Sequence, residues 1–170
     1  MYRKNVCAII FNEDLFFLGC KRINSDLYQF VQGGIEKRDT DLLQAAYREL
    51  QEEIGLLQED LQFVGEILPA SGDPREFRYE LRSTANLRRF GFRGQEQRLM
   101  LFFTQADNIG KVNLVPPKGS GALQEFSHVE WMKIEDIIAR CPKEKAHIFI
   151  AVRNLGLPMA KAFLRSRPAL

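Results

Sequence analysis

The sequence has few of the residues that build disulfide frameworks or zinc sites. Its 170 residues include three cysteines and two histidines, and no Cys-x-x-Cys pair occurs. Cys7 and Cys20 lie in apolar runs, where a buried free thiol is the usual state, and Cys141 stands apart from both. His128 and His147 are not spaced as a pair of metal ligands, so we expect structural or surface roles for both. This cysteine usage favours a reducing compartment.

The sequence also lacks the features of secretion and membrane insertion. No run approaches the roughly 18 apolar residues of a membrane-spanning helix, and the N-terminus has no basic region followed by a long apolar core. We therefore expect a cytoplasmic protein without a membrane partner. Neither sign of charge is in large excess, because 24 lysines and arginines face 22 acidic residues. Any affinity for a polyanion must come from local clusters of charge.

The segment from Gly33 to Leu56 combines a glycine pair with an acidic helix. At about 100° per residue, one apolar stripe should face a core. It comprises Leu43, Ala46, Leu50 and Ile54. Glu49, Glu52 and Glu53 fall together on a neighbouring stripe. Carboxylates at this spacing repel one another and weaken a helix unless positive charge lies among them.

A divalent cation is the natural partner for such a cluster. Carboxylate oxygens are hard ligands that suit Mg²⁺ or Mn²⁺, and a Mg²⁺ ion held by few carboxylates usually shares its shell with substrate phosphates. The alternative is a solvated acidic face, which is common on helix surfaces. The adjoining apolar stripe and the glycine pair, which lets backbone approach a ligand, favour the metal site. The helix therefore points to phosphate chemistry.

These residues resemble the Nudix box, the signature of hydrolases that cleave a diphosphate linked to another moiety. The box of that family reads Gly, five residues, Glu, seven residues, and then R-E-U-x-E-E-x-G-U, where U is aliphatic. The matching residues are Gly34, Arg48, Glu49, Leu50, Glu52, Glu53, Gly55 and Leu56.

One position departs from that pattern. The first Glu of the box falls on Thr40 when counted back from Arg48, and on Asp39 when counted forward from Gly33. In the family this Glu is mostly a structural partner of the box Arg, and here Asp39 or Asp41 is a candidate for that role. Thr40 or Asp39 is also a candidate cap for the helix. The departure therefore bears on how the helix is anchored more than on metal binding.

A longer resemblance, from Tyr2 to about Phe149, points to one branch of the family. That branch contains bacterial RNA pyrophosphohydrolases and asymmetric diadenosine tetraphosphate hydrolases. The matching segments are 2–6, 21–22, 28–35, 78–81, 94–98, 125–131 and 145–149. Tyr28 stands in place of a Trp and Val31 in place of a Pro, and both changes are compatible with a strand.

The resemblance implies a site that uses Mg²⁺ or Mn²⁺, with more than one ion when substrate is bound. The implied metal ligands are Glu49, Glu52, Glu53 and Glu125, the last lying across the cleft from the box helix. Glu53 or Glu52 would also be the base that orients or deprotonates water, since the base is not at one fixed position in the family. The implied substrate contacts are Arg3, Arg22, Gln32, Gly33, Gly34, Gln95 and Lys145. The cations would offset phosphate charge, and the glycine backbone would permit close approach.

Residues 69–94 form a polar segment that contains six arginines. They are Arg75, Arg78, Arg82, Arg88, Arg89 and Arg93, accompanied by Phe77, Tyr79, Phe90 and Phe92. The segment is either a solvated loop or a basic flap near a polyphosphate or RNA 5′ end, where Arg clamps phosphate and rings stack on bases. A second departure lies beyond it. The RNA enzymes of the branch carry a base-stacking aromatic residue before the Lys that Lys145 matches, whereas this chain has Glu144, so base recognition should differ or be weak.

The resemblance implies an α/β fold, the Nudix α/β/α sandwich with a central mixed sheet. The residue pattern agrees, with strands expected at 6–11, 15–20, 28–32, 61–68 and 99–103 and helices after the glycine pair, at 134–139 and at 145–155. Gly156 and Pro158 should end the last helix. No internal repeat supports a second domain, so we expect one Nudix domain, residues 1–158 with its box at about 33–56. Residues 159–170 would be a short basic tail, frayed or docked.

Three functions fit these observations. The leading hypothesis is metal-dependent removal of pyrophosphate or phosphates from RNA 5′ ends, which leaves a 5′-monophosphate. Asymmetric hydrolysis of diadenosine polyphosphates is the close alternative, because both kinds of enzyme share these motifs. A non-catalytic nucleotide or RNA-binding module is the third, and the retained box glutamates with Glu125 speak against it. The sequence leaves the oligomeric state open.

Overall fold

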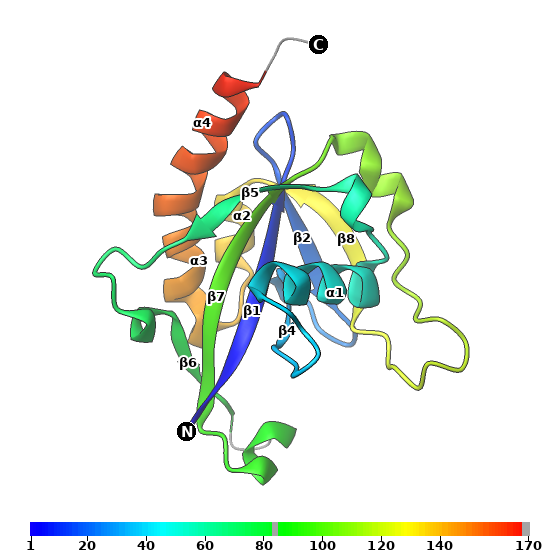
Figure 1. The fold of residues 1–170 in the computed structure, drawn as a ribbon, viewed down its shortest axis with the longest axis vertical. Coiled ribbons are helices and arrows are strands. Elements are labelled where there is room, and N and C mark those ends of the chain that lie inside the picture. Colours follow the sequence, from blue (N-terminus) through cyan, green and yellow to red (C-terminus); the bar gives the residue numbers. More distant parts are fainter. Residues whose placement is uncertain (83–84, 168–170) are drawn as a thin grey trace.

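The structure of the chain, a computed structural model, describes residues 1–82 and 85–167 (Figure 1). The strands are β1 (Tyr2–Phe11), β2 (Phe17–Arg22), β3 (Tyr28–Gln29), β4 (Val31–Gly34), β5 (Gln62–Ile67), β6 (Arg78–Glu80), β7 (Gly94–Phe103) and β8 (Phe126–Met132). The helices are α1 (Leu42–Ile54), α2 (Ile134–Ala139), α3 (Ala146–Ala151) and α4 (Leu157–Ser166), and a π-helical turn, Val152–Gly156, joins α3 to α4. Short 3₁₀ turns lie at Gln58–Asp60, Pro74–Phe77, Asn86–Phe90, Ala106–Lys111 and Lys143–Lys145.

The first strand lies in the middle of the sheet. β1 pairs in parallel with β7 along its whole length, from Tyr2 opposite Gly94 to Phe11 opposite Phe103, and antiparallel with β2 and β4. The main strand order is β3-β2-β1-β7-β5, with β8 beside β2 and β6 beside β7. Because a parallel pair lies among antiparallel ones, the sheet is mixed, as predicted.

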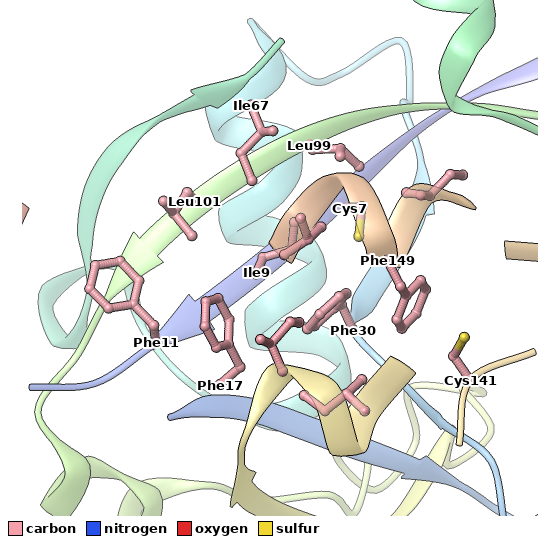
Figure 2. Close-up of a cluster of buried hydrophobic side chains, with 14 of the residues drawn as sticks. Cys7, Ile9, Phe11, Phe17, Phe30, Ile67, Leu99, Leu101, Cys141 and Phe149 are labelled. Carbon is pink, nitrogen blue, oxygen red and sulfur yellow. The ribbon is translucent and has the colours of Figure 1, made fainter. Parts of the chain in front are cut away.

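Both faces of the sheet are covered, because β1 and β7 are apolar at every position in their C-terminal halves. Alternate side chains point to opposite faces of a strand. Cys7, Ile9 and Phe11 join one buried cluster with residues of α2, α3 and α4 (Figure 2). Val6, Ala8 and Ile10 join a second cluster with the apolar stripe of α1. Helices therefore lie on the two faces, and the predicted α/β/α sandwich is confirmed (Figure 1).

The predicted end of the last helix is wrong. Gly156 keeps right-handed helical angles, φ −78° and ψ −40°. It packs closely on β5, because a Cβ added at this position would lie 2.8 Å from Ile67 Cδ1. Pro158 lies in the first turn of α4, after the π-helical turn in which Leu157 donates to Val152. A π turn widens the helix, so the proline ring is accommodated without breaking it.

The predicted basic tail is mostly a docked helix. Phe163 of α4 packs against Phe11 of β1 and Phe103 of β7, with ring centroids 6.0 and 5.2 Å apart. The tail's last residues, 168–170, lie outside the described part of the chain. Helix therefore continues eight residues past the domain boundary expected at 158, through Ser166.

Other boundaries differ by a few residues. The expected strand 28–32 is two strands, because the chain turns at Phe30, whose ring stacks on Phe149 of α3 at 4.8 Å. β7 begins at Gly94, five residues before the expected start.

Within the described residues, no helix has both the length and the apolar character needed to cross a membrane.

Candidate active site

The box helix begins at Asp41. Asp41 has extended backbone angles, and its carboxylate accepts a hydrogen bond of 2.8 Å from the backbone N–H of Gln44. This is an N-cap, which satisfies one of the free N–H groups of the first turn. The expectation that Thr40 or Asp39 caps the helix is therefore wrong. Gly55 ends the helix at φ 72°, a left-handed conformation that favours glycine.

Asp39 holds the box arginine in the role that the family pattern gives to a Glu. Its two carboxylate oxygens accept hydrogen bonds of 2.9 Å from Nε and Nη2 of Arg48, and Nη2 also donates to Gly34 O at 2.9 Å. These bonds from the Arg48 guanidinium are the main reason why the pKa of Asp39 is lowered. Of the two candidates, Asp39 and not Asp41 is the partner of Arg48, and the contact ties α1 to the glycine strand.

The glycine pair packs closely against the ends of two charged side chains. A Cβ on Gly33 would overlap the carboxylate of Glu49, and a Cβ on Gly34 would overlap the guanidinium of Arg3. Both glycines lie on β4 opposite Val6 and Asn5 of β1. The missing side chains therefore let an acid of α1 and an arginine of β1 lie directly against the β4 backbone.

Among the predicted metal ligands, Glu53 has the largest change in pKa. Burial, followed by the negative charges of Glu49 and Glu125, raises its pKa to about 9. Its Oε2 atom is buried and accepts no hydrogen bond from the described residues. Burial also raises the pKa of Glu49. Two adjacent buried carboxyl groups thus lack enough positive charge for both to ionise.

The outer two glutamates are held by arginines. Glu52 lies 3.3 Å from both Arg38 and Arg48, and Glu125 lies 3.4 Å from Arg22. Their side chains are roughly half exposed, so these ion pairs are weak and exchangeable.

The four predicted metal ligands surround one cavity. Glu49, Glu52, Glu53 and Glu125 line a hollow of about 320 Å³, which we call the apolar-walled cavity because its other lining residues are Leu114, Pro116, Ala122 and Leu123. Within residues 1–82 and 85–167, no three acidic, His or Cys side chains converge in metal-binding geometry. The donor set nevertheless fits Mg²⁺ or Mn²⁺ chemically, since all its atoms are carboxylate oxygens and one of them is buried without a partner.

Most of the predicted substrate contacts line two neighbouring cavities that share part of their lining. The first, about 440 Å³ and called the acid cleft here, is lined by Arg3, Arg22, Gln32, Gly33 and Gln95 together with Glu49, Glu53 and Glu125. The second, about 530 Å³ and called the Lys145 cavity, shares Arg22, Gln32 and Gln95 with the first and adds Lys145. Gly34 lines neither cavity and instead supports Arg3.

Lys145 is a buried cation. Its side chain donates a 2.6 Å hydrogen bond to Gln29 Oε1, and its ammonium lies 4.7 Å from the ring centroid of Tyr79. Burial lowers the pKa of Lys145 to about 8. A phosphate nearby would favour the charged form and reverse this shift.

Sequence reasoning missed the polar network that holds these contacts. The hydroxyl of Tyr79 accepts a 2.5 Å hydrogen bond from Gln95 Nε2, while Gln95 Oε1 accepts one of 2.9 Å from Asn5. Gln97 donates to both Asn5 and Gln32. The available signal was the alternation of Gln95 and Gln97 in the polar first half of a strand whose second half is apolar. Buried amides of this kind need hydrogen-bond partners, so they indicate a polar network beneath the cavities. We call these residues, Asn5, Gln32, Tyr79, Gln95 and Gln97, the polar floor.

The arginine-rich segment reaches the cavities, but most of its charge is compensated. Asn86 and Leu87 line both the acid cleft and the Lys145 cavity. Arg75, Arg78 and Arg93 are paired with Asp73, Glu96 and Glu80 at 2.8 to 3.0 Å, and Arg82 lies 3.6 Å from Glu144. Phe77 and Tyr79 are buried, so they are not free to stack on a base, whereas Phe90 is exposed. Residues 83–84 of this segment lie outside the described part.

Comparisons with known proteins agree on one family. The NUDIX domain profile matches residues 1–152. An RNA pyrophosphohydrolase of Halorhodospira halophila is 39% identical over 62% of this chain and 55% of its own length, and one of Xylella fastidiosa is 40% identical over 49% and 40%. The matched region thus spans about half or less of these relatives.

Solved structures show the same fold at low sequence identity. The E. coli dihydroneopterin triphosphate pyrophosphohydrolase superposes with a TM-score of 0.59 at 17% identity, over 91% of this chain and 97% of the other. A C. elegans Ap4A hydrolase superposes with a TM-score of 0.55 at 14% identity, over 92% and 98%.

Proposed function

Because the chain belongs to the NUDIX domain family, we propose that it is a metal-dependent pyrophosphohydrolase that removes pyrophosphate or phosphates from RNA 5′ ends. The product would be a 5′-monophosphate. The observation that carries this proposal is that a buried carboxylate cluster and the cations Arg3, Arg22 and Lys145 line two neighbouring cavities with a shared wall. The relatives named RNA pyrophosphohydrolase support the choice of RNA.

In this proposal Glu49, Glu52, Glu53 and Glu125 hold Mg²⁺ or Mn²⁺, with more than one ion when substrate is bound. Such ions, when bound, polarise bridging phosphates and lower the pKa of water. Glu53 or Glu52 accepts the proton of the attacking water. Glu53 suits this role because its carboxyl group is buried within the cluster. Its pKa is raised to about 9 without metal, and the positive charge of a bound ion would lower that pKa, so that the carboxylate could accept a proton near neutral pH.

The remaining contacts hold the substrate. Arg3 and Arg22 approach the phosphates from the acid cleft, and Lys145 meets a phosphate from its own cavity. Gln32 and Gln95 donate amide N–H groups from the polar floor. Negative charge grows on the phosphate oxygens as the phosphoanhydride bond breaks, so fixed cations there stabilise the transition state.

A second candidate, asymmetric hydrolysis of diadenosine polyphosphates, is favoured by the apolar-walled cavity. This cavity shares Glu49, Glu53 and Glu125 with the acid cleft but is lined by neither Arg3 nor Lys145, and Leu114, Pro116, Ala122 and Leu123 give it an apolar surface. A terminal phosphate gains nothing from such a surface, whereas a second nucleoside can pack its base there.

The test is a side-by-side assay of a 5′-triphosphorylated RNA oligomer and diadenosine tetraphosphate, each with Mg²⁺ and with Mn²⁺. Faster turnover of RNA would support the first candidate, and preference for the dinucleotide would support the second. Glu53→Gln should lower the rate on the preferred substrate by roughly 100-fold or more. Glu59→Gln, an exposed glutamate five residues beyond the helix, is the matched control and should match the unsubstituted protein. Hydrolysis of neither substrate, with metal bound, would point to a non-catalytic binding module.

A further inference from the structure

The Lys145 cavity has the size and lining of a nucleobase pocket. It measures about 530 Å³, and its apolar lining includes Leu27, Leu81, Leu87 and Pro142. Ligand pockets are typically this large and mostly apolar, with a few placed polar groups. Because the cavity shares its wall with the acid cleft, a nucleotide whose phosphates lie in the cleft can extend its base into it.

Glu144 is the acid of this cavity that is open to a base, because Glu80, the other acid of the lining, already accepts hydrogen bonds from Tyr2 and Arg93. It lines the cavity directly beside Lys145, and its side chain is 28% exposed. Its nearest cation is Arg82 Nε at 3.6 Å, and Arg82 is itself 69% exposed. No hydrogen bond links Glu144 to another side chain among the described residues. An ion pair of this length between partly exposed groups is weak, so the carboxylate oxygens keep their acceptor capacity.

A carboxylate discriminates among bases because it can only accept hydrogen bonds. Guanine presents two adjacent donors, N1–H and the N2 amino group, on its Watson–Crick edge. Adenine and cytosine each place a ring-nitrogen acceptor beside their amino group, and uracil places carbonyl oxygens on both sides of its N–H. Only guanine therefore matches both oxygens of a carboxylate without placing two acceptors face to face.

We propose that the Lys145 cavity is a guanine pocket, in which Glu144 accepts hydrogen bonds from N1–H and N2–H of a base whose phosphates lie toward Lys145. This proposal rests on the proposed function and specifies its substrate. The apolar lining covers the faces of the base, and Arg82 lies beside its edge, where a guanidinium can stack on it. Glu144 is then the residue that determines base specificity.

The experiment measures binding of guanosine, inosine and adenosine 5′-diphosphates by calorimetry, so no hydrolysis is needed. The unsubstituted protein should bind the guanine nucleotide roughly tenfold more tightly than the adenine nucleotide, the selectivity of one bidentate base contact, and the inosine nucleotide with intermediate affinity. Inosine lacks only the N2 amino group and so isolates one of the two hydrogen bonds.

Glu144→Gln is the decisive variant, because its amide presents one donor and one acceptor. It should lose the preference for guanine and gain affinity for adenine, an inversion that general damage to the fold would not produce. Glu135→Gln, an exposed glutamate on α2, removes the same charge and should keep the guanine preference. Equal affinity for GDP and ADP in the unsubstituted protein, or an unchanged ratio in Glu144→Gln, would overturn the proposal.

A parallel hydrolysis assay separates this proposal from the proposed function. Triphosphorylated RNA oligomers with guanine or adenine at the first or second position should differ in kcat/KM by a similar factor. If none is hydrolysed while GDP remains preferred, the RNA substrate is wrong and the guanine pocket stands. If all are hydrolysed equally, the pocket is wrong and the enzymatic activity stands.

Discussion

Asp39 and Arg48 are joined by two parallel hydrogen bonds of 2.9 Å, from Nε to Oδ1 and from Nη2 to Oδ2. Side-chain exposure is only 4% for Asp39 and 13% for Arg48. A paired, nearly buried guanidinium is stabilising only while its partner is present. Asp39 has a shorter side chain than the Glu of the family pattern, yet it holds Arg48 of α1 in the same way. It can do so because the preceding loop brings the backbone of residue 39 close to the helix.

Replacing Asp39 should destabilise the protein. Asp39→Ala leaves Arg48 without its bidentate acceptor, and we expect a loss of about 2–3 kcal/mol in the free energy of unfolding. Asp41→Ala should remove only the N-cap and cost about 1 kcal/mol. Thr40→Ala is the control, since Thr40 is exposed. Urea unfolding measures all three, and an equal loss in Thr40→Ala and Asp39→Ala would contradict the assignment.

Gly33→Ala should damage metal binding more than folding. The added Cβ overlaps the Glu49 carboxylate, which must then leave its position in the cluster. We expect Mn²⁺ affinity, measured by titration, to fall at least about tenfold, with unfolding still cooperative. Gly110→Ala is the matched control, because a Cβ there meets no atom within 4 Å. Unchanged Mn²⁺ affinity in Gly33→Ala would show that Glu49 is not a ligand.

The metal-free protein should lose stability as pH rises from 5 to 8. In this range unfolded Glu53, with an ordinary pKa of 4.5, has released its proton, while folded Glu53, with a pKa of about 9, keeps it. The folded state binds more protons, so its free energy of unfolding falls with increasing pH. Glu49, whose pKa is also raised, acts in the same direction.

Thermal unfolding in EDTA at several pH values tests this slope. Glu53→Gln should be more stable than the unsubstituted protein at pH 8 by on the order of 3 kcal/mol and should show a shallower pH dependence. Mg²⁺ or Mn²⁺ should bind more tightly as pH rises, because binding displaces the proton. Parallel stability curves for the two proteins would mean that Glu53 is ionised in the fold.

Substrate binding should weaken above pH 8. Lys145 has a pKa of about 8, so it loses its proton as pH rises through that value and no longer attracts phosphate. We expect KM to rise several-fold between pH 7.5 and 9.5, while Lys145→Gln should have a high KM that is nearly independent of pH. Lys143→Gln, an exposed neighbour, should keep the profile of the unsubstituted protein. A pH-dependent KM that survives in Lys145→Gln would assign the titration to another group.

Much of the fold could be predicted from local sequence. The apolar stripe of the box helix, the strand patterns and the Nudix resemblance together gave the α/β/α sandwich and its mixed sheet, which the structure and the comparisons confirm. The end of the last helix could not be predicted, because Gly156 and Pro158 usually stop a helix. Here a π turn accommodates the proline, and packing on Ile67 requires the glycine.

The charged residues of the candidate site could be predicted from the sequence, whereas the contacts that hold them in place could not. Acids at helical spacing and single cations can be read from sequence, and the structure places them around three neighbouring cavities with shared lining residues. The role of Tyr79 depends on contacts with Gln95 and Lys145, which lie 16 and 66 residues away in the chain. The charge balance of residues 69–94 could be predicted only in part, because Arg78 and Arg82 pair with Glu96 and Glu144, which lie outside the segment.

The central position of β1 has a consequence for the order in which this chain folds. The parallel partner of β1 is β7, which begins 92 residues after Tyr2. One apolar face of β1 is covered at Phe11 by Phe163 of α4. Contacts so distant in sequence form slowly, because a long loop must close before they are made. During synthesis β2, β4 and α1 can pack on the first strand early, but the edge that pairs with β7 and the face covered by α4 stay exposed until those late segments have left the ribosome. These surfaces are the ones that most need protection from aggregation.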